Sequence, residues 1–481
     1  MRHLIKIFAI VLLFSVAGCS QKQSATKKKK PNVVFILADD LGYGDVSCYG
    51  HSKFQTPHID KLATEGMMFT NNYAGSTVCA PSRSALMTGL HTGHTPIRGN
   101  VGVKPEGQYP MPDTLLTIPK LFKEAGYVTG AFGKWGLGYP GSTGDPEHQG
   151  FDEFFGYNCQ TLAHNYYPYY LRHNNEKVEL KENEDTLRGI YSADLINQKA
   201  MEFIRENKDT SFFIFIPSAL PHAELVAPER QMEKFRGKYL PEATYTGVDS
   251  GPRFRKGPYG SQKEAHAAFA GMVDLLDSQV GSILSLLNEL NLEDNTIVIF
   301  TSDNGPHVEG GADPDYFDSN GPLKGYKRDL YEGGIRVPLI IRWPGKVTVG
   351  STSGHVSAFW DWLPTFAELL KSNDNIQTDG ISILPTILSN GDQKKHDFLY
   401  WEFYENSGRV AVLKDNWKLV KYHTATDSPE VMLFNLSDDI GEEHNVADQH
   451  PDIVRELDSL ANISHLPQDP AFEVKMEKVR E

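Results

Sequence analysis

The side chains best suited to chemistry are acidic and amide groups that follow long apolar runs. Asp39 and Asp40 end one such run, and Asp303 and Asn304 follow another that ends in TSDNG. Their oxygen atoms are hard ligands of the kind that Ca²⁺ and Mg²⁺ prefer. Either pair alone is also typical of a helix cap or a turn, but their shared place after apolar runs favours a metal site. Zinc has little support, because the sequence contains neither a CxxC pair nor an HExxH run.

Five basic side chains also follow such runs or begin a predicted helix. They are Arg83, Lys134, His222, Lys327 and Arg336. Arg83 lies four residues after Cys79 in VCAPSRSALMTG, and the N-terminus of a helix attracts anions. Any one of the five is typical of a surface charge or a core histidine. A set of them that faces the metal ligands would instead hold a small tetrahedral oxyanion.

The order of apolar and amphipathic segments predicts an α/β fold. The run Val33–Leu37 is typical of a strand buried on both faces of a parallel sheet. Further apolar runs and helical patterns alternate along the chain, the runs at 128–133, 211–222, 295–305 and 337–345, the helices at 56–69 and 266–290. This alternation predicts a large, mostly parallel sheet sandwiched by helices. Beyond residue 371, short alternating strands predict a smaller α+β domain with an antiparallel sheet, and 239–260 is predicted to be an irregular insertion.

Composition and cysteine count limit the partners. The formal charge is −15, and no stripe of Lys and Arg runs through the body, so nucleic acid is not expected as a partner. Cys48, Cys79 and Cys159 remain after Cys19, an odd number, so at least one thiol stays unpaired. A disulfide between Cys48 and Cys159 is left open by the sequence.

The N-terminus is typical of an export signal. Residues 1–18 contain a basic start and an apolar run too short to span a membrane. The run ends in VAGCS, which predicts a lipoprotein with Cys19 acylated; an ordinary signal peptide with an incidental cysteine is the alternative. Residues 19–30 predict a polar tether, 31–371 a catalytic domain and 372–481 a C-terminal subdomain. We therefore expect a protein held by a lipid in the bacterial cell envelope, facing the periplasm or the cell surface.

The stretch around Cys79 carries a family resemblance. Its pattern C-x-P-S-R followed by T-G resembles the type I, formylglycine-dependent sulfatases of the alkaline phosphatase superfamily. Further blocks support the resemblance from Pro31 through the C-terminal domain: ADDLGYGD, TPHIDKLATEG, GKWGLG, TSDNG and LYEGGIRVP. The resemblance implies an alkaline-phosphatase-like fold and hydrolysis of sulfuric esters.

The resemblance also implies a mechanism. A separate maturation enzyme would oxidise Cys79 to Cα-formylglycine, whose hydrate offers one hydroxyl to attack sulfur and a second to expel sulfate. Asp39, Asp40, Asp303, Asn304 and the modified Cys79 would coordinate a metal ion, with Ca²⁺ expected ahead of Mg²⁺. Arg83 would orient the formylglycine, and Lys134 and Lys327 would bind sulfate oxygens. His222, assisted by Lys327, would protonate the leaving alcohol.

One position departs from the family pattern. The family's usual block is G-K-W-H-x-G, and its histidine commonly helps to eject sulfate. This sequence has Gly136 at the position of that histidine. His91, His94 and His164 are candidates for a replacement by composition only.

The expected substrate is a sulfated glycan, by resemblance one that contains sulfated galactose or N-acetylgalactosamine. The segment 159–175 is rich in aromatic and polar groups, which suits either sugar stacking or a packed loop. Candidate substrate contacts are His164, Asn165, His307, Glu309, Asp313 and Arg336. Two alternatives stay open: a formylglycine-dependent phosphodiesterase or phosphonate hydrolase, and a lipoprotein that binds sulfated glycan without cleaving it.

Overall fold

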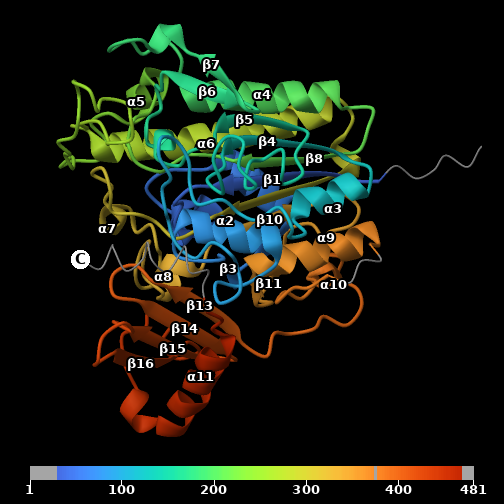
Figure 1. The fold of residues 1–481 in the computed structure, drawn as a ribbon, viewed down its shortest axis with the longest axis vertical. Helices are drawn as coiled ribbons and strands as arrows, with labels where there is room; N and C mark the ends of the chain where they lie inside the picture. Colours follow the sequence, from blue (N-terminus) through green and yellow to red (C-terminus); the bar gives the residue numbers. More distant parts are fainter. Residues whose placement is uncertain (1–29, 373–375, 468–481) are drawn as a thin grey trace, which may run out of the picture.

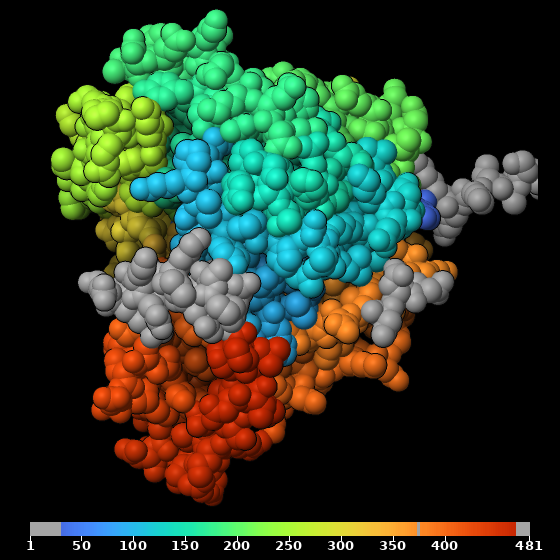
Figure 2. All heavy atoms as spheres, viewed as in Figure 1, coloured from blue at the N-terminus to red at the C-terminus, as the bar shows by residue number. Residues whose placement is uncertain are grey.

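The computed structural model describes residues 30–372 and 376–467 (Figure 1). The predicted signal peptide, the acylated Cys19 and nearly all of the tether lie outside the described residues. An α/β body makes up most of the molecule, and a smaller C-terminal subdomain forms its lower end in Figure 2. This arrangement is the α/β fold with an α+β C-terminal subdomain that the sequence predicts.

A ten-stranded sheet forms the centre of the body. Its order is β11 (Ser351–Ser353), β2 (Met67–Phe69), β10 (Leu339–Arg342), β9 (Thr296–Ser302), β1 (Asn32–Ala38), β8 (Phe212–Pro217), β4 (Val128–Lys134), β5 (Glu153–Tyr157), β6 (Tyr170–His173) and β7 (Glu176–Glu179). The central run β9-β1-β8-β4-β5 is parallel. Strands β10, β6 and β7 pair antiparallel at the two sides. The predicted strands are therefore confirmed in a mixed, mostly parallel sheet.

Two helical layers cover the sheet because β1 is apolar on both faces. Val34 and Ile36 belong to one core, and Val33 and Phe35 belong to the other. The first core is covered by α1 (Pro57–Thr64), α4 (Ser192–Glu206), α5 (Glu229–Phe235) and α6 (Ala265–Glu289). The second is covered by α2 (Cys79–Thr88), α3 (Ile118–Glu124), α9 (Trp362–Leu370) and α10 (Leu384–Ile387) (Figure 1). The apolar α6 is long enough to cross a membrane, but 67% of its apolar 18-residue window is buried inside the body, as in a core helix.

One helix prediction is too long. The segment 56–69 is helical only through Thr64, and Met67–Phe69 is strand β2. Gly66 separates the two at a point where a Cβ would lie 2.4 Å from the carbonyl oxygen of Ile341 in β10. The apolar residues that extended the helical pattern therefore belong to the sheet. The insertion 239–260 contains no helix or strand, as predicted.

The C-terminal subdomain is an antiparallel sheet with one helix. Strands β13 (Leu399–Phe403), β14 (Arg409–Lys414), β15 (Trp417–Tyr422) and β16 (Glu430–Asn435) pair in chain order. Helix α11 (Pro451–Ser464) packs on one face of this sheet through Leu457 and Ala461. Its other face packs on the body through Trp401, which lies against Trp360. The remaining strands and α-helices of the described residues are β3 (Asn72–Tyr73), β12 (Ser357–Ala358), α7 (Pro314–Phe317) and α8 (Glu332–Ile335).

A buried ionic cluster fixes the subdomain to the body. Lys418 of β15 lies 2.8 Å from Glu332 of α8 and 3.0 Å from Glu442, and all three side chains are fully buried. Tyr73 donates a hydrogen bond to Glu332 at 2.9 Å, and Arg336 adds an ion pair at 3.2 Å. Since both carboxylates face one ammonium group, the cluster depends on Lys418.

Replacing Lys418 is therefore expected to cost stability. Lys418→Met leaves two buried carboxylates without their shared cation, so the free energy of unfolding should fall by about 3–5 kcal/mol. Urea unfolding of the purified chain measures the change. The control is Lys421→Met, which breaks a partly exposed pair with Asp458 and should cost ~0–1 kcal/mol. Equal losses in the two variants would contradict the role assigned to the cluster.

Candidate active site

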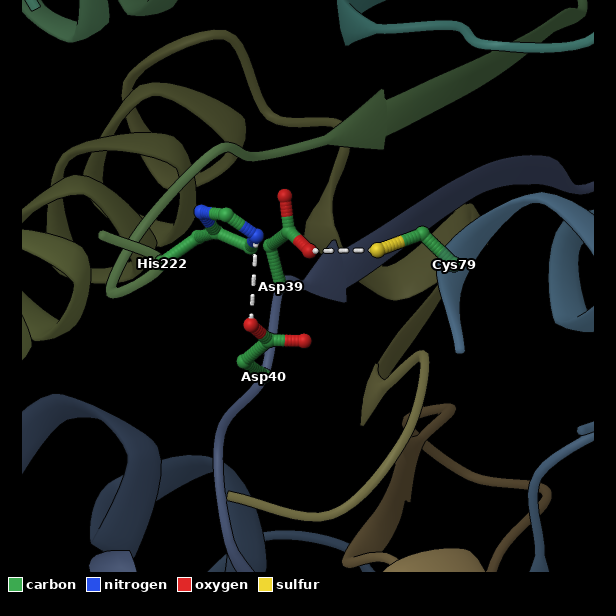
Figure 3. A group of neighbouring side chains, drawn as sticks. All are labelled: Asp39, Asp40, Cys79 and His222. Carbon is green, nitrogen blue, oxygen red and sulfur yellow. Dashed lines mark hydrogen bonds and ion pairs between the residues drawn. The ribbon is translucent and has the colours of Figure 1, made fainter. Parts of the chain in front are cut away.

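Four oxygen-bearing residues meet at the carboxyl edge of the parallel strands. In the sheet register Ala38 pairs with Ser302, so the loops after β1 and β9 start side by side. These loops carry Asp39, Asp40, Asp303 and Asn304, and each side chain is completely buried. Figure 3 shows Asp39 between Cys79 and His222, with Asp40 beneath them. The strand-end pattern therefore brings the predicted metal ligands together.

The backbone of Asp40 is held in an uncommon conformation. Its φ is +61°, in the left-handed region that Asp enters more readily than most residues. Its N–H donates to the Asp303 carboxylate at 3.1 Å, and Asn304 donates to the Asp40 carboxylate at 2.7 Å. These bonds lock the two loops to each other. The turn therefore places the Asp39 and Asp40 carboxylates beside Asp303 and Asn304 of the second loop.

Cys79 is the first residue of α2 and lies at the floor of the site. Its Sγ is 3.4 Å from Asp39 and 3.4 Å from the Lys134 ammonium group. Burial raises the pKa of this thiol, as does the Asp39 carboxylate, although Lys134 opposes them. Helix α2 ends at Gly89, whose φ of +69° supplies the left-handed cap. The short helix therefore points its N-terminus, with Cys79, at the carboxylates.

Arg83 holds the floor of the site in place. Its Nε and one terminal nitrogen donate to Asp303 at 3.1 and 2.9 Å, and the other terminal nitrogen donates to the backbone carbonyl of Lys134. Ser82 adds a hydrogen bond from its hydroxyl to the carbonyl of Asp303 at 2.5 Å. Arg83 thus binds the protein itself and joins α2 to the ends of β4 and β9.

Lys134 and Lys327 compensate the carboxylates. Lys134 lies 2.6 Å from Asp39, and Lys327 lies 2.7 Å from Asp40. Burial opposes the charged form of both partners, yet the charges of Lys134 and Arg83 hold the pKa of Asp39 well below its usual range. Burial lowers the pKa of Lys327, but the charges of Asp40, Glu309 and Asp39 together outweigh burial and raise it. Both lysines therefore remain ammonium groups in the interior.

His222 lies in the middle of a stack of three imidazoles. Its ring centroid is 5.1 Å from that of His164 and 5.5 Å from that of His307. Burial lowers the pKa of His222, and the nearby Lys327 and Lys134 lower it further, so the ring is neutral. Its Nδ1–H donates to the carbonyl of Ala223, and its Nε2 faces the Lys327 ammonium group at 3.0 Å. A proton of the Lys327 ammonium group therefore lies in the hydrogen bond between Nζ and Nε2 of His222.

A polar cavity of about 150 Å³ opens above these groups. Its lining consists of Cys79, Asn100, Gly102, Gln108, Lys134, Gln160, Thr161, His164, His222, Tyr259, Glu309, Lys327 and Arg328. Glu309 forms an ion pair with Arg328 and lies 3.7 Å from the Lys327 ammonium group. The wall therefore offers both donors and acceptors around the thiol.

Four of the six proposed substrate contacts, Asn165, His307, Asp313 and Arg336, do not line this cavity. Arg336 lies at the subdomain junction, where it pairs with Glu332 and donates to the carbonyl of Thr70 at 2.7 Å. Asn165 uses its amide to hold the insertion, through Glu224, Gly257 and Pro258. His307 is buried behind His222 and donates to the carbonyl of Pro221 at 3.4 Å. Arg336, Asn165 and His307 thus make contacts within the fold, whereas His164 and Glu309 line the cavity.

Other interpretations of single residues also change. Asp313 caps α7 by accepting from the N–H of Tyr316 at 3.0 Å. His94 pairs with Asp379 at 2.9 Å and stacks on His91, and neither histidine lines the cavity. Among the aromatic residues of 159–175, Tyr166 is completely buried, as the packed-loop alternative expects, while Tyr167, Tyr169 and Tyr170 are half-buried. Cys48, Cys79 and Cys159 are all free thiols, so the disulfide between Cys48 and Cys159 that the sequence left undecided is absent from the described residues.

Several lining residues were not singled out from the sequence. They are Asn100, Gly102, Gln108, Gln160, Thr161, Tyr259 and Arg328. They come from four stretches of the chain that lie far apart in sequence, around 100–108, 160–161, 259 and 328. In the sequence, Arg328 could have been suspected as a lining residue only because it follows Lys327, and Gln160 only because it lies near His164.

The residues at the strand ends fit a hard divalent cation. Three carboxylates converge there in the interior, and the side-chain oxygen of Asn304 is buried without a hydrogen-bond partner among the described residues. Asp39, Asp40 and Cys79 also place ligand atoms within 4.8 Å of one another. Oxygen ligands of this kind suit Ca²⁺ or Mg²⁺.

Comparison with known proteins identifies the family. Residues 31–372 match the family model described as Sulfatase, and residues 325–463 match the one described as N-sulphoglucosamine sulphohydrolase, C-terminal. The chain is 31% identical to an N-acetylgalactosamine-6-O-sulfatase of Bacteroides thetaiotaomicron, over 92% of this chain and 96% of that protein. It is also 31% identical to the N-acetylgalactosamine-6-sulfatase of Canis lupus familiaris, over 96% of this chain and 84% of that protein.

A solved structure agrees with this result. The crystal structure of Ps i-CgsB in complex with k-i-k-neocarrahexaose superposes with a TM-score of 0.76 at 27% identity, covering 94% of this chain and 98% of that one. The chain belongs to the sulfatase family and is a sulfuric ester hydrolase of the alkaline phosphatase superfamily fold.

The fork of Arg83 supports a stability prediction. Arg83→Lys keeps the charge but cannot bind Asp303 with two nitrogens and the Lys134 carbonyl with a third. The free energy of unfolding should fall by about 1–3 kcal/mol, as measured by guanidinium unfolding. Arg236→Lys is the matched control, since its pairs with Glu229 and Glu264 lie at the surface, and it should lose clearly less. If Arg83→Lys had the same free energy of unfolding as the parent, the three hydrogen bonds of the Arg83 guanidinium group would not be needed for stability.

Proposed function

We propose that this enzyme removes sulfate from sulfated glycans with a formylglycine made from Cys79. The observation that carries the proposal is the position of this thiol, at the floor of a polar cavity and within 3.4 Å of both Lys134 and Asp39. A buried thiol with a raised pKa is a poor nucleophile, which argues that the sulfur is not the group that reacts. A hydrated aldehyde at residue 79 would supply a hydroxyl for attack on sulfur and a second one for release of sulfate.

The proposed metal is Ca²⁺. Asp39, Asp40, Asp303, Asn304 and the modified residue 79 would hold it, and when bound it supplies Lewis acidity toward a sulfate oxygen. The three buried carboxylates and the unpartnered oxygen of Asn304 support this assignment.

Lys134 and Lys327 are placed to grip the sulfate group. Both ammonium groups line the cavity, and both are held by carboxylates that fix their positions. Two cations around residue 79 neutralise the charge of a sulfate ester and leave its sulfur facing that residue. Arg83 has a positioning role, because its donors are already used by Asp303 and the Lys134 carbonyl.

The Lys327–His222 pair is suited to protonate the leaving alcohol. Lys327 carries a proton toward Nε2 of His222, and the Nδ1–H bond to Ala223 fixes the ring. An alkoxide of a sugar is a poor leaving group, so the reaction needs a positioned acid. The pair lines the cavity beside Cys79, where the leaving oxygen of a bound ester would lie.

A sugar is the proposed leaving group. Relatives named N-acetylgalactosamine-6-sulfatases and a structure with a bound carrahexaose support sulfated N-acetylgalactosamine or galactose. The cavity adds neighbouring donors and acceptors, such as Arg328, Glu309 and Asn100, which suit sugar hydroxyls. Export by the N-terminal signal and anchoring through acylated Cys19 would place the enzyme where such polymers occur; both belong to this proposal, as does a separate maturation enzyme.

Residue 79 gives a direct test. Cys79→Ala, produced together with a formylglycine-generating enzyme, should lose all measurable sulfate release while its thermal unfolding stays close to that of the parent. Mass spectrometry of the parent should find residue 79 with its sulfur replaced by a carbonyl oxygen. Full activity in the Ala variant, or an active parent that keeps its thiol, would remove the formylglycine from the proposal.

The substrate is tested with a panel of singly sulfated monosaccharides. In the presence of Ca²⁺ we expect sulfate release from one regioisomer of galactose or N-acetylgalactosamine, and loss of that release after chelation. An aryl sulfate and an aryl phosphate are assayed beside the panel. Faster cleavage of the phosphate would favour a phosphodiesterase or phosphonate hydrolase, and tight binding of sulfated glycan without release would favour a binding protein.

A further inference from the structure

Gln160 is a buried amide in the wall of the cavity with no assigned task. It follows β5 and lines the same cavity as Cys79 and Lys134, yet its side chain is only 6% exposed. Its Nε2 has no hydrogen-bond partner among the described residues. A donor in this state is unfavourable unless a ligand or water accepts its hydrogen bond.

The protein holds Gln160 firmly beside the end of β4. Its backbone N–H donates to the side chain of Gln108 at 2.8 Å. Its carboxamide lies against Gly136, where an added Cβ would be 2.6 Å from both Cγ and Nε2 of Gln160. Gly136 has a φ of +80° and follows Lys134 by two residues. The glycine therefore leaves the volume that the carboxamide occupies, next to a lysine that faces the thiol.

We propose that Gln160 binds the sulfate group directly, donating a hydrogen bond from Nε2 to a sulfate oxygen of the bound ester. Burial strengthens a hydrogen bond to an anion. Because Nε2 of Gln160 has no partner among the described residues, it can form this bond without breaking another. A carboxamide has no ionisation near neutral pH, so Gln160 holds the sulfate and takes no proton from residue 79. The inference rests on the proposed function for its substrate, but the binding of sulfate can be measured without turnover.

Two measurements test the proposal. In the Cys79→Ala background, the Kd of inorganic sulfate by calorimetry should rise about tenfold with Gln160→Leu, which keeps the bulk and removes the donor. In the matured enzyme, kcat/KM for an aryl sulfate should fall roughly 10- to 100-fold. Gln160→Glu has nearly the same shape but carries a charge that repels sulfate, so its losses should exceed those of Gln160→Leu. Thermal unfolding checks that each variant folds.

Gln149→Leu is the matched control for loss of a buried glutamine. Gln149 is fully buried but bonds to the carbonyls of Pro112 and Thr143, so this variant should lose stability and keep its sulfate affinity. Gly136→Ala should weaken sulfate binding by displacing the carboxamide, and should cause no further loss when Gln160→Ala is already present. Unchanged sulfate affinity in folded Gln160→Leu overturns the proposal. A parent that binds sulfate but releases none would count against the proposed function and leave the role of Gln160 to the affinity data.

Discussion

Compensation of charge in a dry interior is the constraint on which the rest of this structure depends. Three carboxylates, Asp39, Asp40 and Asp303, are buried together with three cations, Lys134, Lys327 and Arg83. Removing either set from water alone would cost far more than the fold can supply, so each charge needs its partner at close range. The six groups come from five segments of the chain, and their mutual attraction fixes where those segments meet. The price of this arrangement is that no member can be changed in isolation.

The parallel sheet is what makes such an arrangement reachable. Strands β1, β8, β9 and β4 run in the same direction, so the residues that follow them gather at one edge. Residues as distant as Asp40 and Lys327, 287 positions apart, then meet without a long connection across the molecule. Helix α2 completes the edge from the side, and its N-terminus adds a partial positive charge to that of the lysines. The site is thus a property of the strand order and of one helix.

The strand ends and the motif residues could be predicted because they obey local rules. Apolar runs long enough for buried strands located Asp39 and Asp303, and the pattern around Cys79 located α2. Arg336 and Asn165 were predicted as substrate contacts but do not line the cavity, because sequence proximity to a motif does not set the direction of a side chain. Arg336 turns toward Glu332, and Asn165 toward the insertion. The cavity wall was equally out of reach, since Gln160 and Tyr259 meet only through the tertiary fold.

The burial of Cys79 sets a time limit on any enzyme that must reach it. The thiol is 1% exposed, and α2 is fastened from behind by the bond of Ser82 to Asp303, 221 residues later in the chain. Until β9 is made and docked, that fastening does not exist and the segment around Cys79 is open. At a synthesis rate of about 5–20 residues per second, the interval is roughly 10–45 s. Oxidation of the thiol by the proposed maturation enzyme would therefore compete with folding, and a chain that folds first would be closed to that enzyme.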